Sequence, residues 1–130
     1  QNIKANGFKL DTGADGQGNA ILDYHTFQAT ISYSKICDRP SPSEIVGENG
    51  YVLIDKISAP SNIKVFNREG VLQKEYNNDS PLTMKDEIIE FINCVQNHKV
   101  ESSINTHQRS LETIKVLDEI RHQIGVQFNV

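Results

Sequence analysis

The pattern of apolar and polar residues changes once along the chain, close to residue 80. Before that point, apolar residues recur at every second position in short runs that are separated by Gly, Pro, Asn and Asp. This period predicts β-strands joined by turns. After it, apolar residues recur at every third or fourth position, which predicts two amphipathic helices. Strands first and helices afterwards are typical of an α+β fold.

The stretch Ser43–Asp55 is the best-defined part of the pattern and reads as strand, tight turn, strand. Asn49 and Gly50 both tolerate a positive φ, so they predict a two-residue type I′ turn. The run Tyr51–Ile54 that follows is apolar on both faces. A strand without a polar face has to be covered on both sides, so we expect it at the centre of a sheet.

Further strands are expected on both sides of this hairpin. They cover residues 1–10, 20–25, 27–36, 63–67 and 71–76. Because the connections are short, neighbouring strands should run antiparallel. Residues 11–19 are rich in Asp, Asn and Gly and are interpreted as a hairpin loop. A calcium loop is disfavoured because its twelfth position is Leu22, and a phosphate-binding glycine loop because no helix follows.

The strand 27–36 alternates strictly between apolar and polar residues, so one of its faces should lie on a core. Its other face is rich in Ser and Thr and could contact solvent, another subunit or a ligand. Composition leaves these alternatives open, with solvent or an oligomer contact favoured. The polar face consists of Gln28, Thr30, Ser32 and Ser34.

The first helix is predicted to begin after Thr83, with Asp86 completing a capping box, and to end at Lys99. The second is predicted from His107 or Gln108 to the C′ residue Gly125. A last short strand is expected at 126–128. The predicted fold is therefore a mostly antiparallel, open-faced sheet with two C-terminal helices packed on one face.

Composition narrows the function classes. The chain has 130 residues, a net charge of −4 and 37% hydrophobic residues, which suits a single domain covering 1–130. No apolar run approaches the roughly 20 residues that a membrane-spanning helix needs. The chain has no basic stripe, so nucleic-acid binding is also not expected. Cys37 and Cys94 lie in no metal-type cluster and are interpreted as reduced thiols of a cytoplasmic protein.

No complete active site can be recognised from the residues. The four histidines are scattered, and none pairs with Cys or Asp at the spacing of metal ligands. His98 and His122 lie near predicted helix C-termini, where the helix dipole favours a cation. We therefore expect no catalytic, cofactor-binding or metal-binding residue within the chain.

Four blocks of the sequence are familiar in their order and spacing. They cover residues 41–55, 84–92, 110–121 and 125–128. Together they resemble the C-terminal domain of the glucose-fructose oxidoreductase / inositol dehydrogenase / rhizopine-catabolism (Gfo/Idh/MocA) family. The resemblance extends over nearly the whole chain, and the block that contains Gly47, Glu48 and Gly50 is the strongest.

The resemblance implies a function for a larger parent protein. Proteins of this family hold NAD or NADP in an N-terminal Rossmann domain, and their C-terminal domain forms one wall of the substrate cleft. The open sheet face of that domain commonly makes the oligomer interface. The family's catalytic Lys lies in a Glu-Lys-Pro motif of the nucleotide domain. This sequence has neither that motif nor a Gly-x-Gly-x-x-Gly loop.

The resemblance therefore predicts the C-terminal, substrate-wall and oligomerisation domain of an NAD(P)-dependent oxidoreductase, with the Rossmann domain absent. Its small-molecule substrate would be a sugar, a polyol or a related hydroxyl compound. The chain begins at Gln1 without an initiator Met, and we expect a fragment that is inactive alone and binds no cofactor. The expected partners are its own Rossmann domain and further copies of itself.

Three residues are candidates for the substrate wall: Lys35, His25 and His107. Lys35 lies at the end of the alternating strand, His25 at a strand end beside Tyr24, and His107 at the start of the last helix. The alternative hypothesis is a stand-alone α+β module that binds a ligand or a partner without catalysis.

Overall fold

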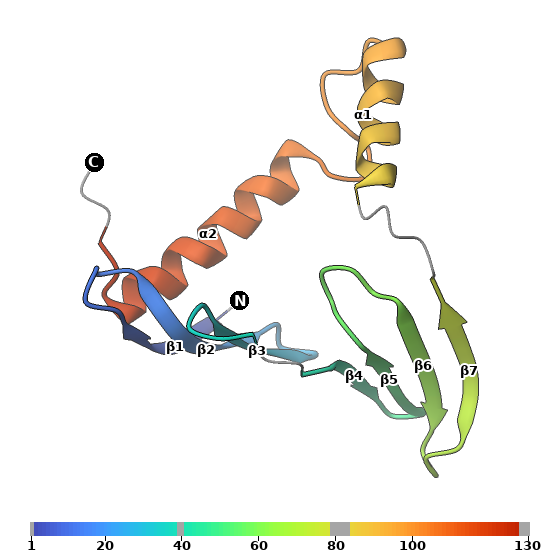
Figure 1. Cartoon of the computed structure of the whole chain (residues 1–130), viewed down its shortest axis with the longest axis horizontal. Helices are drawn as coiled ribbons and strands as arrows, with labels where there is room; N and C mark the ends of the chain where they lie inside the picture. The colour runs from blue at the N-terminus through green and yellow to red at the C-terminus, as the bar shows by residue number, and fades with distance from the viewer. Residues whose placement is uncertain (1, 39–40, 79–83, 128–130) are drawn as a thin grey trace. The chain divides into compact units, whose positions relative to one another are not determined.

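The computed structural model describes residues 2–38, 41–78 and 84–127. These residues form an α+β fold of antiparallel strands followed by two C-terminal helices, which confirms the predicted class. They divide into two compact units. Unit 1 comprises the described residues of 1–39 and 99–130, and unit 2 those of 40–98. Each unit contains one sheet and one helix (Figure 1).

Sheet A belongs to unit 1 and contains β1 (Asn2–Lys9), β2 (Asp15–Asp23) and β3 (Gln28–Ser34) in that order. Both pairs of strands are antiparallel. In β2 every second residue is buried, namely Gly16, Gly18, Ala20 and Leu22. The small size of the first three leaves room for other side chains to lie close to the strand.

The loop expected at 11–19 is shorter than predicted, because β2 begins at Asp15. The prediction for Asp15–Asn19 is therefore wrong. Gly16 and Gly18 are strand residues whose missing side chains make space for neighbours. A Cβ atom at Gly18 would lie 2.7 Å from Tyr33 Oη, and one at Gly16 would lie 2.8 Å from Leu10 Cδ2. Glycine at these two positions allows neighbouring side chains to approach the strand closely and does not form a turn.

Helix α2 (His107–Ile124) packs with its C-terminal part against β1 and the adjacent part of β2 (Figure 1). It begins at the N-cap Thr106 and ends at Gly125, whose φ of 80° is the predicted left-handed C-terminal cap. Ile120 is buried together with Ala20 and Leu22. Gln123 Nε2 donates to Ile3 O at 2.9 Å, and its Oε1 accepts from Ala5 N at 2.7 Å. The last turns of α2 are thus bonded to the backbone of β1.

Sheet B belongs to unit 2 and contains β4 (Ser43–Gly47), β5 (Gly50–Ile54), β6 (Asn62–Asn67) and β7 (Leu72–Asn77) in that order. The predicted central position of β5 is confirmed, because it pairs with both β4 and β6. Burial is weaker than predicted. Only Ile54 of this strand is buried, and the other four residues are half-buried.

The hairpin turn between β4 and β5 differs from the predicted type I′ turn. Gly47 pairs with Gly50, so Glu48 and Asn49 are the two central residues, and neither has a positive φ. Gly50 has a φ of 146°, and a Cβ atom there would lie 2.0 Å from Phe66 O. Glycine is required at Gly50 because a neighbouring strand lies so close.

Helix α1 (Lys85–Gln96) also belongs to unit 2. Its N-cap residue is Met84, which makes no side-chain cap hydrogen bond. The predicted cap Thr83 lies outside the described residues, and the helix ends three residues before Lys99.

Two expectations about the arrangement of sheets and helices are not met. The strands form two sheets instead of one, and among the described residues of unit 2 α1 makes no close contact with a strand of sheet B. The 3.6-residue period identifies the apolar stripe of a helix but not the surface that the stripe meets. The last predicted strand is also absent at Val126 and Gln127, while Phe128 lies outside the described residues.

Candidate functional site

Lys35 lies directly after β3, as expected, and forms an ion pair with the first residue of β2. Its Nζ atom donates to Asp15 Oδ1 at 2.7 Å. Its backbone N–H donates to Gly16 O at 2.7 Å, so the β2–β3 ladder extends as far as this residue. The Lys35 side chain is 55% exposed and that of Asp15 only 13%. The Lys35 side chain therefore lies largely in solvent, while the Asp15 carboxylate with which it pairs is mostly covered.

Tyr33 lies on β3, two residues before Lys35, and completes this cluster. Its ring lies over Gly18, its cross-strand partner. The Oη atom is buried and has no hydrogen-bond partner among the residues that the structure describes. Burial raises the pKa of Tyr33, and the nearby Asp15 carboxylate raises it further, although the two groups do not meet the geometry of a hydrogen bond. The hydrogen bond from Lys35 holds the pKa of Asp15 below its usual value.

His25 lies in the turn between β2 and β3 and is exposed. Its φ is 68°, and its backbone N–H donates to Asp23 Oδ1 at 3.1 Å. Tyr24 and Phe27 stack across the turn with ring centroids 4.5 Å apart. The backbone contact gives His25 a role in this exposed turn.

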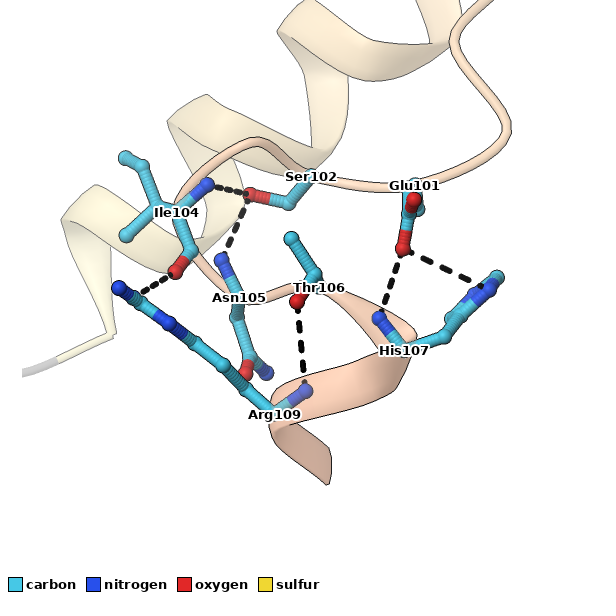
Figure 2. Close-up of polar contacts among 7 residues, drawn as sticks. All are labelled: Glu101, Ser102, Ile104, Asn105, Thr106, His107 and Arg109. Carbon is cyan, nitrogen blue, oxygen red and sulfur yellow. Dashed lines mark hydrogen bonds and ion pairs between the residues drawn. The ribbon is translucent and has the colours of Figure 1, made fainter. Parts of the chain in front are cut away.

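His107 is the first residue of α2, and Figure 2 shows the polar contacts around it. Its backbone N–H donates to Glu101 Oε2 at 2.7 Å, and its Nδ1 atom lies 3.6 Å from the same oxygen. The N-cap Thr106 accepts from Arg109 N at 3.3 Å. Arg109 in turn donates from its guanidinium to Ile104 O. The His107 side chain itself is 76% exposed.

The helix N-termini of the chain do not suit the phosphates of a dinucleotide. At the start of α2, side chains of the chain already accept from the backbone N–H groups of His107 and Arg109, and the acceptor of the first is the Glu101 carboxylate. An anion here would be repelled. The first turn of α1 carries Asp86 and Glu87, which repel anions in the same way. Neither of the two described helix N-termini therefore suits the phosphates of NAD or NADP.

The structure does not bring the three candidates together. Lys35 lies beside the first residue of β2 and His25 beyond its last. These two ends are about 26 Å apart, which is the length of the nine-residue strand β2. His107 begins an 18-residue helix whose opposite end contacts β1, about 25 Å away along the helix axis.

His107 lies beside Glu101 and His25 beside Asp23, whereas Lys35 lies in a cluster with two other ionisable side chains, Asp15 and Tyr33. Sequence reasoning missed both of them, because it placed Asp15 in a loop and Tyr33 only in the core. The alternation of Gly16, Gly18, Ala20 and Leu22 is the signal that would have extended β2 back to Asp15.

No group of three or more His, Cys, Asp or Glu that could hold a metal ion occurs in residues 2–38, 41–78 and 84–127. None of the described helices is long and apolar enough to span a membrane.

Comparison with known proteins identifies the class to which the chain is similar. No protein-family model matches it. Two relatives are oxidoreductases, one of them an inositol dehydrogenase of the Gfo/Idh/MocA type, and the chain matches the C-terminal part of that protein, which agrees with the resemblance of the four sequence blocks.

Two relatives carry this conclusion. The chain is 38% identical to scyllo-inositol 2-dehydrogenase (NADP(+)) IolU of Bacillus subtilis (strain 168) over 128 residues, which cover 98% of the chain and 39% of the relative. It is 33% identical to the uncharacterized oxidoreductase YgjR of Escherichia coli (strain K12), covering 98% of the chain and 38% of that protein. The chain thus spans less than half the length of these relatives.

Proposed function

We propose that the chain is the C-terminal part of an NAD(P)-dependent oxidoreductase that acts on a sugar, a polyol or a related hydroxyl compound. The observation that carries this proposal is the 38% identity to a scyllo-inositol 2-dehydrogenase over 98% of the chain. The cofactor, bound by an upstream Rossmann domain, supplies the hydride chemistry. The residues of this chain form one wall of the substrate cleft.

Lys35 is the residue that we propose for contact with substrate. An ammonium group donates hydrogen bonds to hydroxyl oxygens, and one of its three donors is already used by Asp15 at 2.7 Å. The exposed side chain leaves the others accessible to a ligand. His25 and His107 stay weaker candidates, because the carboxylates beside them, Asp23 and Glu101, accept backbone N–H groups at a turn and at a helix N-terminus.

We also propose that the parent protein is a homo-oligomer, as the family resemblance implies. Apolar residues that are half-buried or exposed on sheet B support this proposal, since large apolar patches mark interfaces. They include Ile45, Val46, Tyr51 and Leu72. Sedimentation of the parent enzyme should detect the assembly, and a monomer at high concentration would contradict it.

A hybrid enzyme tests the proposed function. In this hybrid, the matched C-terminal segment of IolU is replaced by the present chain. We expect the hybrid to reduce NADP(+) with scyllo-inositol, and the chain alone to show neither turnover nor NADP(+) binding. Truncated IolU that ends before the matched segment serves as the control and should be inactive. A folded hybrid that binds NADP(+) but oxidises no polyol would favour the alternative of a non-catalytic binding module.

A further inference from the structure

The cluster at the start of β2 contains three ionisable side chains from two neighbouring strands. Asp15 is the first residue of β2, whereas Tyr33 and Lys35 come from β3 and the position directly after it. All three belong to unit 1. Asp15 is the least exposed member of the ion pair, at 13% against 55% for Lys35. The carboxylate is therefore the fixed partner of the pair, and the Lys35 side chain is the partner that a ligand in solvent can reach.

Backbone contacts on both sides fix Asp15. Asp15 pairs with Lys9 of β1 at a β-bulge, and the next residue, Gly16, accepts the backbone N–H of Lys35 at 2.7 Å. Tyr33 closes the inner side, because its ring lies over Gly18 and its hydroxyl is buried near the carboxylate. A carboxylate in such a position has few ways to move, so its direction relative to the sheet is set by the fold.

A lysine side chain is much more mobile than this carboxylate. It has four rotatable bonds, and ordering it costs rotamer entropy. A hydrogen bond to a fixed carboxylate removes part of this freedom before a ligand arrives. An ammonium group that is ordered in advance binds a hydroxyl oxygen more tightly than a mobile one, because the ordering cost is no longer part of binding.

We propose that Asp15 is a positioning residue that acts through Lys35: it fixes the Lys35 ammonium group at the end of sheet A so that the remaining N–H donors bind a hydroxyl oxygen of the polyol substrate. This inference rests on the proposed function, since it concerns the same substrate wall. It goes further by assigning Asp15 a role that requires no contact with substrate. Tyr33 supports Asp15 from the buried side.

A double-mutant cycle in the hybrid enzyme tests the proposal. We expect Lys35→Met to raise KM for scyllo-inositol by roughly tenfold or more, the cost of one hydrogen bond to a charged group, with kcat changed much less. Asp15→Asn should raise KM by a smaller factor. In the Lys35→Met background, Asp15→Asn should have no further effect, because its action passes through Lys35.

A matched control separates this coupling from the loss of any surface ion pair. Glu75→Gln breaks the Lys64–Glu75 pair of sheet B, whose charged atoms are 3.6 Å apart. It should leave KM unchanged. Asp15→Glu retains the charge and should restore part of the loss. Independent effects of Asp15→Asn and Lys35→Met that multiply in the double variant would overturn the proposal.

A spectroscopic measurement on the chain tests the positioning step without turnover. In the ¹⁵N-labelled chain at low temperature, the Nζ resonance of Lys35, assigned by its loss in Lys35→Arg, should shift on Asp15→Asn toward the values of solvated lysines. An unchanged resonance would overturn the proposal, even if the hybrid is active. A hybrid without any dehydrogenase activity would instead contradict the proposed function, and with it the substrate role of Lys35.

Discussion

The two units use their strands in different ways. In unit 1, the covered face of β2 is built from three small residues and Leu22, and α2 is bonded to the backbone of β1 through Gln123. In unit 2, β5 has large apolar residues on both faces, yet only Ile54 is buried. Close approach and specific hydrogen bonds therefore produce the core of unit 1. Apolar composition alone does not produce an equivalent core in unit 2.

The helix of unit 1 also makes more specific contacts than the helix of unit 2. α2 has a Thr N-cap, a left-handed Gly at its end and a buried Ile120. α1 has no side-chain cap hydrogen bond, whereas both helices keep exposed apolar residues, such as Phe91 of α1 and Leu111 of α2. The sequence pattern marks both helices equally well, but only α2 carries residues that fit a described strand. Four substitutions test whether this difference between the units is correct.

The largest effect is expected at the β4–β5 hairpin. Gly50→Ala places a Cβ atom 2.0 Å from Phe66 O at a φ of 146°, so the strands must move apart. We expect a loss of roughly 2–4 kcal/mol in the stability of sheet B. Amide hydrogen exchange of β5 and β6 measures this loss. Gly47→Ala is the matched control, because its nearest neighbour would be 3.8 Å away. Equal effects of the two substitutions would show that the close approach at Gly50 is wrong.

The attachment of α2 to sheet A should be the next most sensitive feature. Gln123→Ala removes the hydrogen bonds to Ile3 O and Ala5 N. We expect unit 1 to lose about 1–2 kcal/mol, measured by urea unfolding. Gln108→Ala on the same helix removes only an i,i+4 contact with Glu112 and should cost a few tenths of a kcal/mol. A Gln123 variant as stable as the Gln108 variant would contradict the described docking of α2.

The caps of the two helices provide a smaller test. Thr106→Ala removes the hydrogen bond from Arg109 N and should destabilise α2 by about 1 kcal/mol. Met84→Ala at the corresponding position of α1 should change little, because Met84 makes no cap hydrogen bond. Hydrogen exchange in the first turn of each helix distinguishes the two. A loss of protection in α1 as large as in α2 would remove the distinction between the helices.

The smallest effect is a dependence on pH in unit 2. Asp55 accepts hydrogen bonds from Ser61, first of all from its hydroxyl, and from backbone N–H groups, which lower its pKa to about 2. Because the folded pKa is depressed, its stabilising contribution is present above pH 3.8 and is lost as the pH falls through 2. The stability difference between the wild-type chain and Asp55→Asn should therefore shrink below pH 4. A difference that stays constant from pH 6 to pH 2 would contradict this role.

Much of the strand order could be read from the sequence, because period-two alternation and turn residues are local signals. The hairpin at Ser43–Asp55 and the cap at Gly125 follow from such signals. The prediction failed where glycine had a packing role. Gly16 and Gly18 look like loop residues, but in the fold they make room for Leu10 and Tyr33.

The candidate site was less predictable for the same physical reason. Lys35 was identified by its place at a strand end, but its partner Asp15 is 20 residues away and was assigned to a loop. The pairing of Asp15 with Lys35 depends on the register of β2 and β3, which the alternation of residues does not fix. Contacts between distant residues, including those of Gln123 with β1, could not be read from local patterns.

The most direct test of the substrate-wall assignment compares two Michaelis constants in IolU and in the hybrid enzyme. The account predicts that exchanging the C-terminal segment changes KM for scyllo-inositol and leaves KM for NADP(+) within about twofold, because the cofactor is bound elsewhere. A changed KM for NADP(+) with an unchanged KM for the polyol would contradict it. That result would place the segment at the cofactor and not at the substrate.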